Sequence, residues 1–381
     1  MKITDVRIRS IRFVLPKPQS NNRWTWQNMD HSIVEMFTDE GITGIGAGGG
    51  LGVDRLVLDW ARRVVVGEDP FNYERIWNKL YTGVPPFLTR EALNSGEAIV
   101  AMSAIDTAVW DIIGKALNRP VYQLLGGARD KVRAYASGGH YISTGTEELR
   151  SLEEEMSAYI DAGFKAVKMR VGRFSIKEDA ERVRVVRDTV GDDVQIMLDA
   201  NWCWTTATQA ITFMRAVEKY NIFLLEEPVY PDNYHALREI GQAIDTHVAS
   251  GESEYTLWSC RSLIETRTVD ILQADATHCG GVTEWRKIAA MCRAYYIPLI
   301  PHGGLGGGVE INSHCAASLP ETEAWYVEYM RPLDGWPEAW QADPLKVDKD
   351  GYIQLRNRPG YGIVLDEAAI EKHQRSVYRT E

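Results

Sequence analysis

The second part of the chain alternates short apolar runs with helix-length amphipathic stretches, and this rhythm constrains the fold more than any other feature. Eight such runs follow one another from about residue 131 to residue 329, each short enough to be a buried strand. Strands separated by helices pair in parallel, and eight of these units predict a closed α/β barrel of the (β/α)₈ type. The runs are VRAYAS, FKAVKMR, VQIMLDA, FLLEEP, HVASGE, ILQAD, IPLIP and AWYVEY.

The first part of the chain has the pattern of an α+β domain. The tail, in contrast, contains too many turn residues to form another barrel unit, and we expect it to pack on the N-terminal domain. We therefore divide the chain into 1–128, 129–350 and 351–381. In the first part, strands are expected at 3–14, 32–38 and 42–46, and helices at 54–66, 70–80 and 92–116.

Composition limits the classes of partner. The 381 residues, 45% hydrophobic and 25% charged, are typical of a globular protein of roughly two domains. A net charge of −11 without any Lys/Arg-rich run argues against nucleic acid and against an anionic membrane, but not against a small anionic substrate. The five cysteines are scattered and the N-terminus lacks a signal-peptide core, so we expect a cytoplasmic protein.

Polar residues end the predicted barrel strands, one strand after another. Reacting groups in such barrels lie at the carboxyl ends of the strands, and these residues would be costly to bury without partners. A single polar ending carries little information, but a long series of them rarely arises by chance. In strand order they are Lys168 and Arg170, Asp199 and Asn201, Glu226 and Glu227, Glu252, Asp275, His302 and Glu328.

Three of these residues, Asp199, Glu226 and Glu252, end three adjacent strands. Three carboxylates at one rim repel one another unless a cation lies between them. Because every candidate ligand is a hard oxygen donor, the set favours Mg²⁺ over Zn²⁺. The alternative is three unrelated acids at the ends of loops.

His302 follows the apolar run IPLIP, and Asp275 ends the preceding strand. A histidine in such a place is often structural. A carboxylate bound to one ring nitrogen, however, fixes the tautomer, raises the basicity and leaves the other nitrogen to accept a proton. We therefore predict that His302 is a general base oriented by Asp275.

Several longer segments agree in order, spacing and strand placement with one known family. They are WDIIGKALNRPVYQLLGG before the barrel, GFKAVKMRVG, LDAN, LLEEP, SGES, QADATHCGGVTEW and IPLIPH on strands two to seven, and PGYGI in the tail. Over essentially its whole length the chain resembles the mandelate racemase subgroup of the enolase superfamily.

This resemblance implies a modified, TIM-type (β/α)₇β barrel under an α+β capping domain that the C-terminal segment completes. It also implies that Mg²⁺ binds Asp199, Glu226 and Glu252 and chelates the carboxylate of a small-molecule substrate. A base would then remove the proton α to that carboxylate, giving an enediolate that the metal stabilises. Relatives are commonly dimers or octamers, so a homo-oligomer is expected.

The resemblance further implies roles for other strand-end residues. Lys168 corresponds to a lysine that contacts the substrate carboxylate, and Glu328 to a hydrogen-bond donor or electrophilic partner of that group. Asn201 would contact the carboxylate or an ordered water. A plain strand-end carboxylate at 328 and a loop-capping role for Asn201 stay open as alternatives, and Glu227 is expected to support its neighbours rather than bind metal.

The chain departs from the subgroup at strand two. Relatives usually carry Lys-x-Lys there, with the second lysine as a base opposite the histidine, whereas this chain has Lys168-Met169-Arg170. Arginine stays protonated, so Arg170 is either a fixed positive charge near the substrate or a structural residue.

With His302 as the one base, β-elimination is favoured. His302 would take the α-proton and hand it to the departing 3-hydroxyl, giving water and a 2-keto-3-deoxy acid. We therefore predict a sugar-acid dehydratase, a lyase. The alternatives are a cycloisomerase of a sugar-acid lactone or anhydro sugar acid, and a racemase or epimerase of a 2-hydroxy acid.

Substrate selection is expected from the capping domain. The loops at 16–31 and 46–52 are placed to close over the barrel mouth. Trp24 and His140 are candidate substrate contacts, although packing within the protein is an equal alternative for each.

Overall fold

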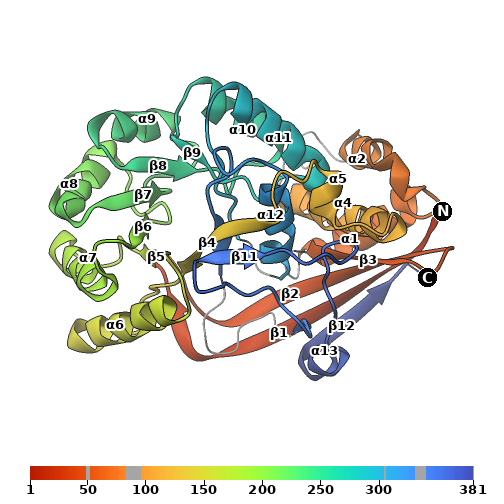
Figure 1. Cartoon of the computed structure of the whole chain (residues 1–381), viewed down its shortest axis with the longest axis horizontal. Coiled ribbons are helices and arrows are strands. Elements are labelled where there is room, and N and C mark those ends of the chain that lie inside the picture. Colours follow the sequence, from red (N-terminus) through yellow and green to blue (C-terminus); the bar gives the residue numbers. More distant parts are fainter. Residues whose placement is uncertain (49–51, 83–95, 304–305, 331–339, 381) are drawn as a thin grey trace.

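The computed structural model describes residues 1–48, 52–82, 96–303, 306–330 and 340–380, and it forms a barrel beside an N-terminal sheet (Figure 1). The barrel strands are parallel and follow the order β10-β4-β5-β6-β7-β8-β9. This confirms the predicted parallel barrel. The strands are β4 (Lys131–Ser137), β5 (Ala166–Arg170), β6 (Gln195–Asp199), β7 (Ile222–Glu226), β8 (His247–Ser250), β9 (Ile271–Leu272) and β10 (Val327–Tyr329).

The strand predicted from IPLIP is shortened. In the described part of the chain, Leu299 forms isolated parallel bridges to Leu272 and Ala324, which link β9 to the segment before β10. Pro298 and Pro301 flank this bridge, and proline has no N–H to donate to a neighbouring strand. The barrel therefore closes through a minimal seventh strand.

Helices follow the strands and cover the outside of the barrel (Figure 1). The first two of these outer helices are α6 and α7, and a capping box between Ser175 and Glu178 starts α7. The remaining outer helices follow the later strands. The helices are α6 (Gly145–Asp161), α7 (Ile176–Val190), α8 (Ala207–Val217) with η3 (Glu218–Tyr220), α9 (Tyr234–Ala243), α10 (Thr256–Glu265), α11 (Val282–Ala294) and α12 (Gly308–Ala317).

The interior of the barrel is a separate apolar cluster. Alternate residues of a strand face opposite sides, so the inward positions of each strand continue upward in steps of two. Most of the polar strand-end residues therefore continue these inward-facing rows above the cluster, whereas Glu227 and Glu252 are out of step with Leu224 and Ala249. The cluster contains Tyr135, Ala166, Met197, Leu224, Ala249, Ile271, Ile300 and Tyr326.

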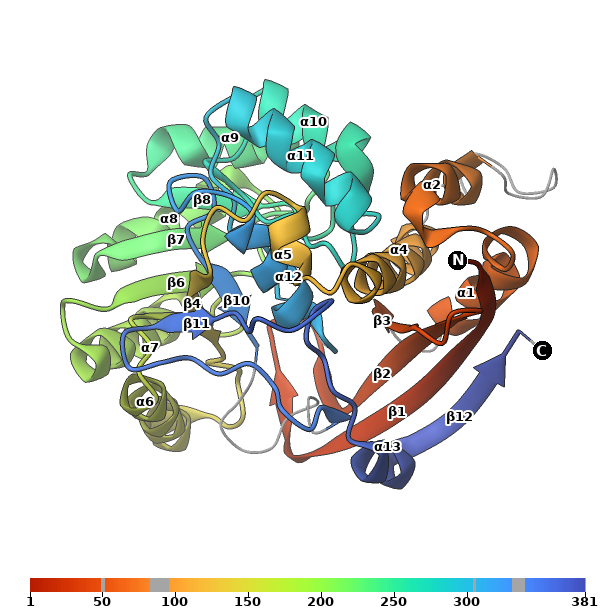
Figure 2. The same cartoon turned by 45° about the vertical axis from the view of Figure 1, so that its right-hand side comes forward.

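The N-terminal sheet is antiparallel with the order β12-β1-β2-β3. Figure 2 shows β12, from the C-terminal tail, lying along β1. The strands are β1 (Ile3–Ser20), β2 (Thr25–Thr38), β3 (Thr43–Gly48) and β12 (Gln374–Arg379); the helical elements are α1 (Val53–Trp60), η1 (Ala61–Val65), η2 (Pro70–Asn72), α2 (Tyr73–Thr82), α4 (Gly96–Ala116), α5 (Val121–Leu124) and α13 (Glu367–His373).

The segment 16–31 is not the loop that we predicted. Both strands continue through it and form a long hairpin whose turn lies between Ser20 and Thr25. The Asn21 side chain accepts hydrogen bonds from the backbone N–H groups of Arg23 and Trp24, both at 2.8 Å, and this closes the turn. In the other predicted loop, 46–52, residues 46–48 belong to β3 and 49–51 lie outside the described residues.

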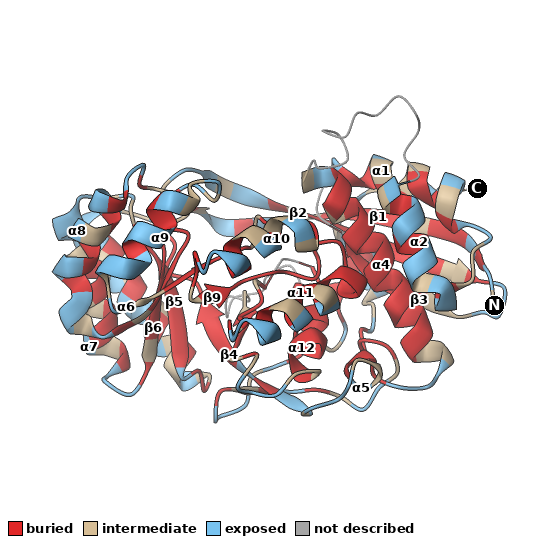
Figure 3. Ribbon diagram, turned by 90° about the horizontal axis from the view of Figure 1, so that it is seen from above, coloured by how far each residue is buried: buried red, intermediate tan, exposed pale blue. Residues whose placement is uncertain are grey.

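Helix α4 joins the sheet to the barrel and is almost entirely buried (Figure 3). A Cβ atom at Gly44 or Gly46 of β3 would collide with the carbonyl oxygens of Ala108 and Ala104, so glycine permits this close packing. None of the described helices is both long enough and apolar enough to cross a membrane.

The C-terminal segment contacts both parts of the molecule. Strand β11 (Tyr352–Gln354) pairs with β4 of the barrel, whereas α13 and β12 pack on β1. The expected packing of the tail on the N-terminal domain thus holds from α13 onward. The division at residues 128 and 350 stays a prediction.

Candidate functional site

The polar strand-end residues converge above the barrel interior, with Lys168 at their centre. Its Nζ lies 2.8 and 3.0 Å from the two carboxylate oxygens of Glu226, 2.7 Å from Glu328 and 3.5 Å from Asp199. All of these side chains are buried. Lys168, expected to contact a substrate carboxylate, therefore neutralises carboxylates of the protein itself.

Arg170 lies one inward position further along β5. Its guanidinium forms an ion pair with Asp199, and its Nε donates a hydrogen bond to Nε2 of His140 at 3.4 Å. The side chain is 6% exposed and lines a cavity of about 350 Å³. Arg170 is thus a fixed charge at the rim of this cavity.

His302 and Asp275 form the predicted pair. Nδ1 of His302 lies 2.9 Å from a carboxylate oxygen of Asp275, and Nε2 lies 3.4 Å from Glu252. Burial would raise the pKa of Asp275, but His278 and His302 outweigh it and hold that pKa below its usual range. Asn312 donates 2.8 Å hydrogen bonds to Asp275 and to the carbonyl of His302, so the pair is held on both sides.

The charge state of His302 depends on its acidic surroundings. Burial by itself would lower the pKa of His302, but nearby carboxylates, Glu252 and Glu328 foremost, outweigh burial and raise the pKa to about 10. As a base, His302 must be neutral. A cation that takes over the charge of Glu252 would lower this pKa toward the range in which a base works.

Glu328, expected to be a hydrogen-bond donor or electrophilic partner of the substrate carboxylate, pairs with Lys168 in this structure. Burial would raise its pKa, but Lys168, His302 and Arg170 outweigh burial and hold it below the usual range. Its carboxylate accepts a 2.9 Å hydrogen bond from the N–H of Gly303. An ionised carboxylate can only accept, so Glu328 is here the counter-ion of Lys168.

The site carries an excess of negative charge that suits a divalent cation. Among the described residues, five carboxylates and the carboxyl group of Glu227 gather around three cationic side chains, and oxygen atoms provide the negative charge. The acids are Asp199, Glu226, Glu227, Glu252, Asp275 and Glu328; the cations are Lys168, Arg170 and His302. The donor chemistry of Asp199, Glu226 and Glu252 therefore fits Mg²⁺.

The positions of the three predicted ligands support Mg²⁺ binding less clearly than their chemistry does. Among the described residues, the group with ligand atoms within 4.8 Å of one another is Asp275, His278 and His302, not the three predicted carboxylates. Lys168 pairs with Asp199 and Glu226, Arg170 pairs with Asp199, and Glu252 faces His302 instead. We favour the carboxylates because Asp275 already accepts hydrogen bonds from Thr277 and Asn312 and holds His302.

Glu227 and Trp202 form a hydrogen-bonded chain that ends on the predicted ligand Glu252. Glu227 is buried, and burial, together with Glu252 and Glu226, holds its pKa well above the usual range. The Trp202 indole N–H donates to one of its oxygens, and Glu227 shares a hydrogen bond with Glu252. Both residues have positive φ angles, 59° at Trp202 and 44° at Glu227, so the backbone is strained to place them there.

Replacing Trp202 with phenylalanine is expected to weaken Mg²⁺ binding roughly 10-fold. The aromatic packing against Trp24 and Tyr230 is kept, while Glu227 loses its donor beside Glu252. Isothermal titration calorimetry measures the affinity. Trp204→Phe is the matched control, because Trp204 packs on Phe213 and should leave the affinity unchanged; equal affinities of both variants would contradict the role given to Trp202.

The tip of the β1–β2 hairpin contacts the barrel mouth. Asn22 donates hydrogen bonds to the carbonyls of Ala200 (2.9 Å) and Asn201 (3.2 Å), next to the predicted ligand Asp199. Arg23 lies over the rings of Trp24, Trp202 and Tyr230, at 5.9, 5.5 and 4.6 Å from their centres. The hairpin is therefore clamped to the loops that follow β6 and β7.

Among the candidate substrate contacts, His140 and Asn201 line the cavity beside Arg170, whereas Trp24 does not. Trp24 is 52% exposed and packs edge-on against Trp202, because it belongs to the hairpin turn rather than to the strand. Trp26, on β2, lines the cavity instead. The cavity residues are Asn21, Trp26, Asn28, Met29, Asp30, His140, Arg170, Asn201 and Met330.

Two buried residues were missed by the sequence argument. Gln273 donates a 2.7 Å hydrogen bond to Glu226, and it lies two residues before Asp275, so strand alternation could have identified it. Asn312 lies on α12, where no local signal connects it with Asp275.

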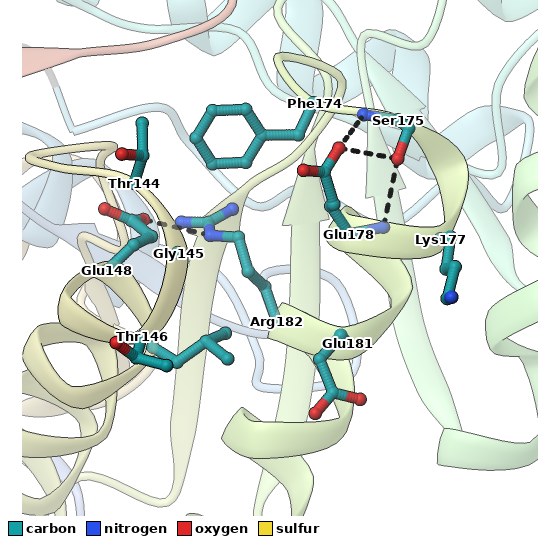
Figure 4. A pocket seen from close by; sticks show the side chains of 11 residues that line it. Thr144, Gly145, Thr146, Glu148, Phe174, Ser175, Lys177, Glu178, Glu181 and Arg182 are labelled. Carbon is teal, nitrogen blue, oxygen red and sulfur yellow. Dashed lines mark hydrogen bonds and ion pairs between the residues drawn. The ribbon is translucent and has the colours of Figure 1, made fainter.

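A second cavity, of about 630 Å³, lies between the N-terminal ends of α6 and α7 and contains no predicted site residue (Figure 4). Arg182 projects toward it and is bound to Glu148 at 3.0 Å. The same guanidinium donates to the carbonyls of Arg170 (2.6 Å) and Gly139 (2.8 Å). Arg182 therefore fixes the backbone under the first cavity.

Models of two protein families match the chain. Residues 3–126 match the N-terminal domain of mandelate racemase / muconate lactonizing enzyme, and residues 151–369 match the enolase C-terminal domain-like family.

Individual relatives agree with these matches. The arabinonate dehydratase of Saccharolobus solfataricus is 33% identical over 91% of both chains. The 3,6-anhydro-alpha-L-galactonate cycloisomerase of Streptomyces coelicolor is 30% identical over 94% of this chain and 96% of its own. A racemase from Streptomyces coelicolor A3(2), solved with bound magnesium, has a TM-score of 0.88 and 29% identity, with coverage of 98% and 100%.

Proposed function

Because the chain belongs to the mandelate racemase / muconate lactonizing enzyme family of the enolase superfamily, we propose that it is a magnesium-dependent sugar-acid dehydratase. One observation carries the choice among the reactions of this family. Arg170 stands where relatives place a second base, and its guanidinium is held by Asp199 and His140. His302 is then the one base of the reaction.

Asp199, Glu226 and Glu252 would hold Mg²⁺. Bound there, the ion supplies positive charge that holds the substrate carboxylate and offsets the negative charge developing on its oxygens. Asp275 holds Nδ1 of His302, so Nε2, which lies between Glu252 (3.4 Å) and Glu328 (3.8 Å), is the atom that accepts the α-proton.

The same imidazole also serves as the acid in the elimination step. After the C2–H bond breaks, the imidazolium of His302 gives its proton to the 3-hydroxyl as the C3–O bond breaks. Water leaves and the enol that remains becomes a 2-keto-3-deoxy acid. The relation to arabinonate dehydratase supports a sugar acid as the substrate class.

A cycloisomerase is the second candidate. It uses the same first step, but a ring oxygen leaves C3 or C4 in place of water, and the relation to the anhydrogalactonate cycloisomerase favours it. A racemase or epimerase, the reaction named for the solved relative, needs a base on each face of the substrate.

Incubation with Mg²⁺ and a panel of aldonic and aldaric acids, with their lactones, tests the proposal. Formation of a 2-keto product with loss of water is expected from at least one acid. A 2-keto product without loss of water would identify a cycloisomerase. Exchange of the α-proton with solvent deuterium without elimination would identify a racemase, and no turnover by folded, metal-bound protein would refute all three.

The cytoplasmic location and the dimer or octamer stay predictions. Size-exclusion chromatography with light scattering measures the second of them.

A further inference from the structure

His140 is a buried histidine that lines the cavity beside Arg170. It follows β4 at the barrel mouth and is 8% exposed. Trp26 packs edge-on against its ring, with 5.2 Å between ring centres, and this limits rotation of the imidazole. The side chain therefore has one fixed orientation toward Arg170 and the cavity.

The backbone next to His140 is held in place by a required glycine and by hydrogen bonds. Gly139 has a φ of +62°, and a Cβ there would lie 2.5 Å from the Cβ of Met169, so glycine is required. The N–H of Arg170 donates to the carbonyl of Gly139, and Arg182 donates to the carbonyls of both residues. His140 and Arg170 are thus clamped together.

The hydrogen bond between them fixes the tautomer of His140. An arginine N–H can only donate, so Nε2 of His140, 3.4 Å from Nε of Arg170, must be the accepting, unprotonated nitrogen. In the neutral ring the proton is then on Nδ1. Among the described residues, the His140 ring has its side-chain hydrogen bond through Nε2 and none through Nδ1, and His140 lines the cavity, so we infer that the Nδ1–H is free to bind a ligand there.

We propose that His140 is a neutral hydrogen-bond donor that binds an oxygen of the substrate through Nδ1–H, and that Arg170 locks it in this form. This inference rests on the proposed function, to which it adds a specificity residue for a hydroxyl or carboxylate oxygen. It also excludes His140 as the missing second base. A proton on Nε2 would face the N–H of Arg170 and place two cations 3.4 Å apart.

The electrostatics agree with this assignment. Burial, with the charges of Arg170 and Lys168 adding to it, holds the pKa of His140 well below its usual range. A neutral imidazole that donates a hydrogen bond can polarise an oxygen without transferring a proton.

Imidazole ¹⁵N NMR tests the tautomer without any turnover. The wild-type enzyme with Mg²⁺ is compared with His140→Asn, whose missing signals assign His140. Between pH 6 and 8 we expect the His140 ring to stay neutral with its proton on Nδ1. In Arg170→Met we expect this single tautomer to be no longer fixed. A charged ring, an Nε2–H tautomer, or a signal unchanged in Arg170→Met would overturn the proposal.

A pair of variants separates a donor from a base. Asn presents an N–H near the position of Nδ1 but cannot carry a proton, whereas Leu offers neither. With the acid that the panel identifies as substrate, His140→Leu is expected to raise KM about 10-fold, and His140→Asn to restore most of it. Equal loss of kcat in both variants would instead show a proton-transfer role. If no acid is turned over, the proposed function fails while the NMR result still decides the tautomer.

Discussion

Replacing His302 with asparagine is expected to lower kcat by about 10⁴-fold, while Mg²⁺ binding is retained. Among the described residues, the imidazole of His302 is the group that we assign to take the α-proton, because Asp275 holds Nδ1 and Nε2 faces the acidic centre of the barrel mouth. Asparagine can keep the hydrogen bond to Asp275 but cannot accept a proton. Steady-state kinetics on the identified acid, with calorimetric titration of Mg²⁺, measures both quantities.

His278→Asn is the matched control for this variant. The ring of His278 lies 5.6 Å from that of His302, and its Nδ1 lies 3.7 Å from the same carboxylate of Asp275. It is not at the inward position of a strand, so we expect at most a small loss of kcat. Comparable losses in both variants would mean that the base has been misassigned.

Replacing Glu226 with glutamine is expected to weaken Mg²⁺ binding by roughly 100-fold or more, since it removes a charged ligand rather than a supporting residue. The adjacent residue offers the control. Burial and two neighbouring carboxylates hold the pKa of Glu227 well above its usual range, so Glu227→Gln removes less charge from the site than Glu226→Gln does. That variant is expected to lose about 10-fold in affinity at most.

The same measurement decides between the two candidate metal sites. Binding at Asp199, Glu226 and Glu252 makes the affinity sensitive to Glu226→Gln and insensitive to His278→Asn. The reverse pattern would place the ion at Asp275, His278 and His302. Because Glu226 is also a partner of Lys168, thermal unfolding must show that Glu226→Gln is folded before its affinity is compared.

Much of the barrel and of its site could be predicted because both depend on local patterns. The alternation of apolar runs with helices predicts parallel strands, and alternation within each strand places Lys168, Asp199 and Glu226 above the interior row of Ala166, Met197 and Leu224. Prediction was poorer where one residue type changes the local geometry, as at Pro298 and Pro301, which reduce the seventh strand to a bridge.

The hairpin at 16–31 shows a different limit. Its prolines and polar residues are typical of a loop, yet pairing between β1 and β2 continues to Ser20 and Thr25. Tertiary contacts with the barrel, such as the hydrogen bond from Asn22 to Ala200, 178 residues later, favour the extended hairpin. Local sequence cannot report a contact that distant.

The sequence by itself determined the barrel and most of the residues that meet at its mouth, because strand period and strand order follow from the chain alone, and its motifs indicated the family by resemblance. Only the tertiary structure decided which of those residues pair with one another and which carry charge. Lys168 neutralises carboxylates from three other strands, Arg170 fixes the tautomer of His140, and Trp202 holds Glu227. Charge and tautomer depend on burial and on neighbours brought together from distant parts of the chain, so they become defined only when the barrel has closed.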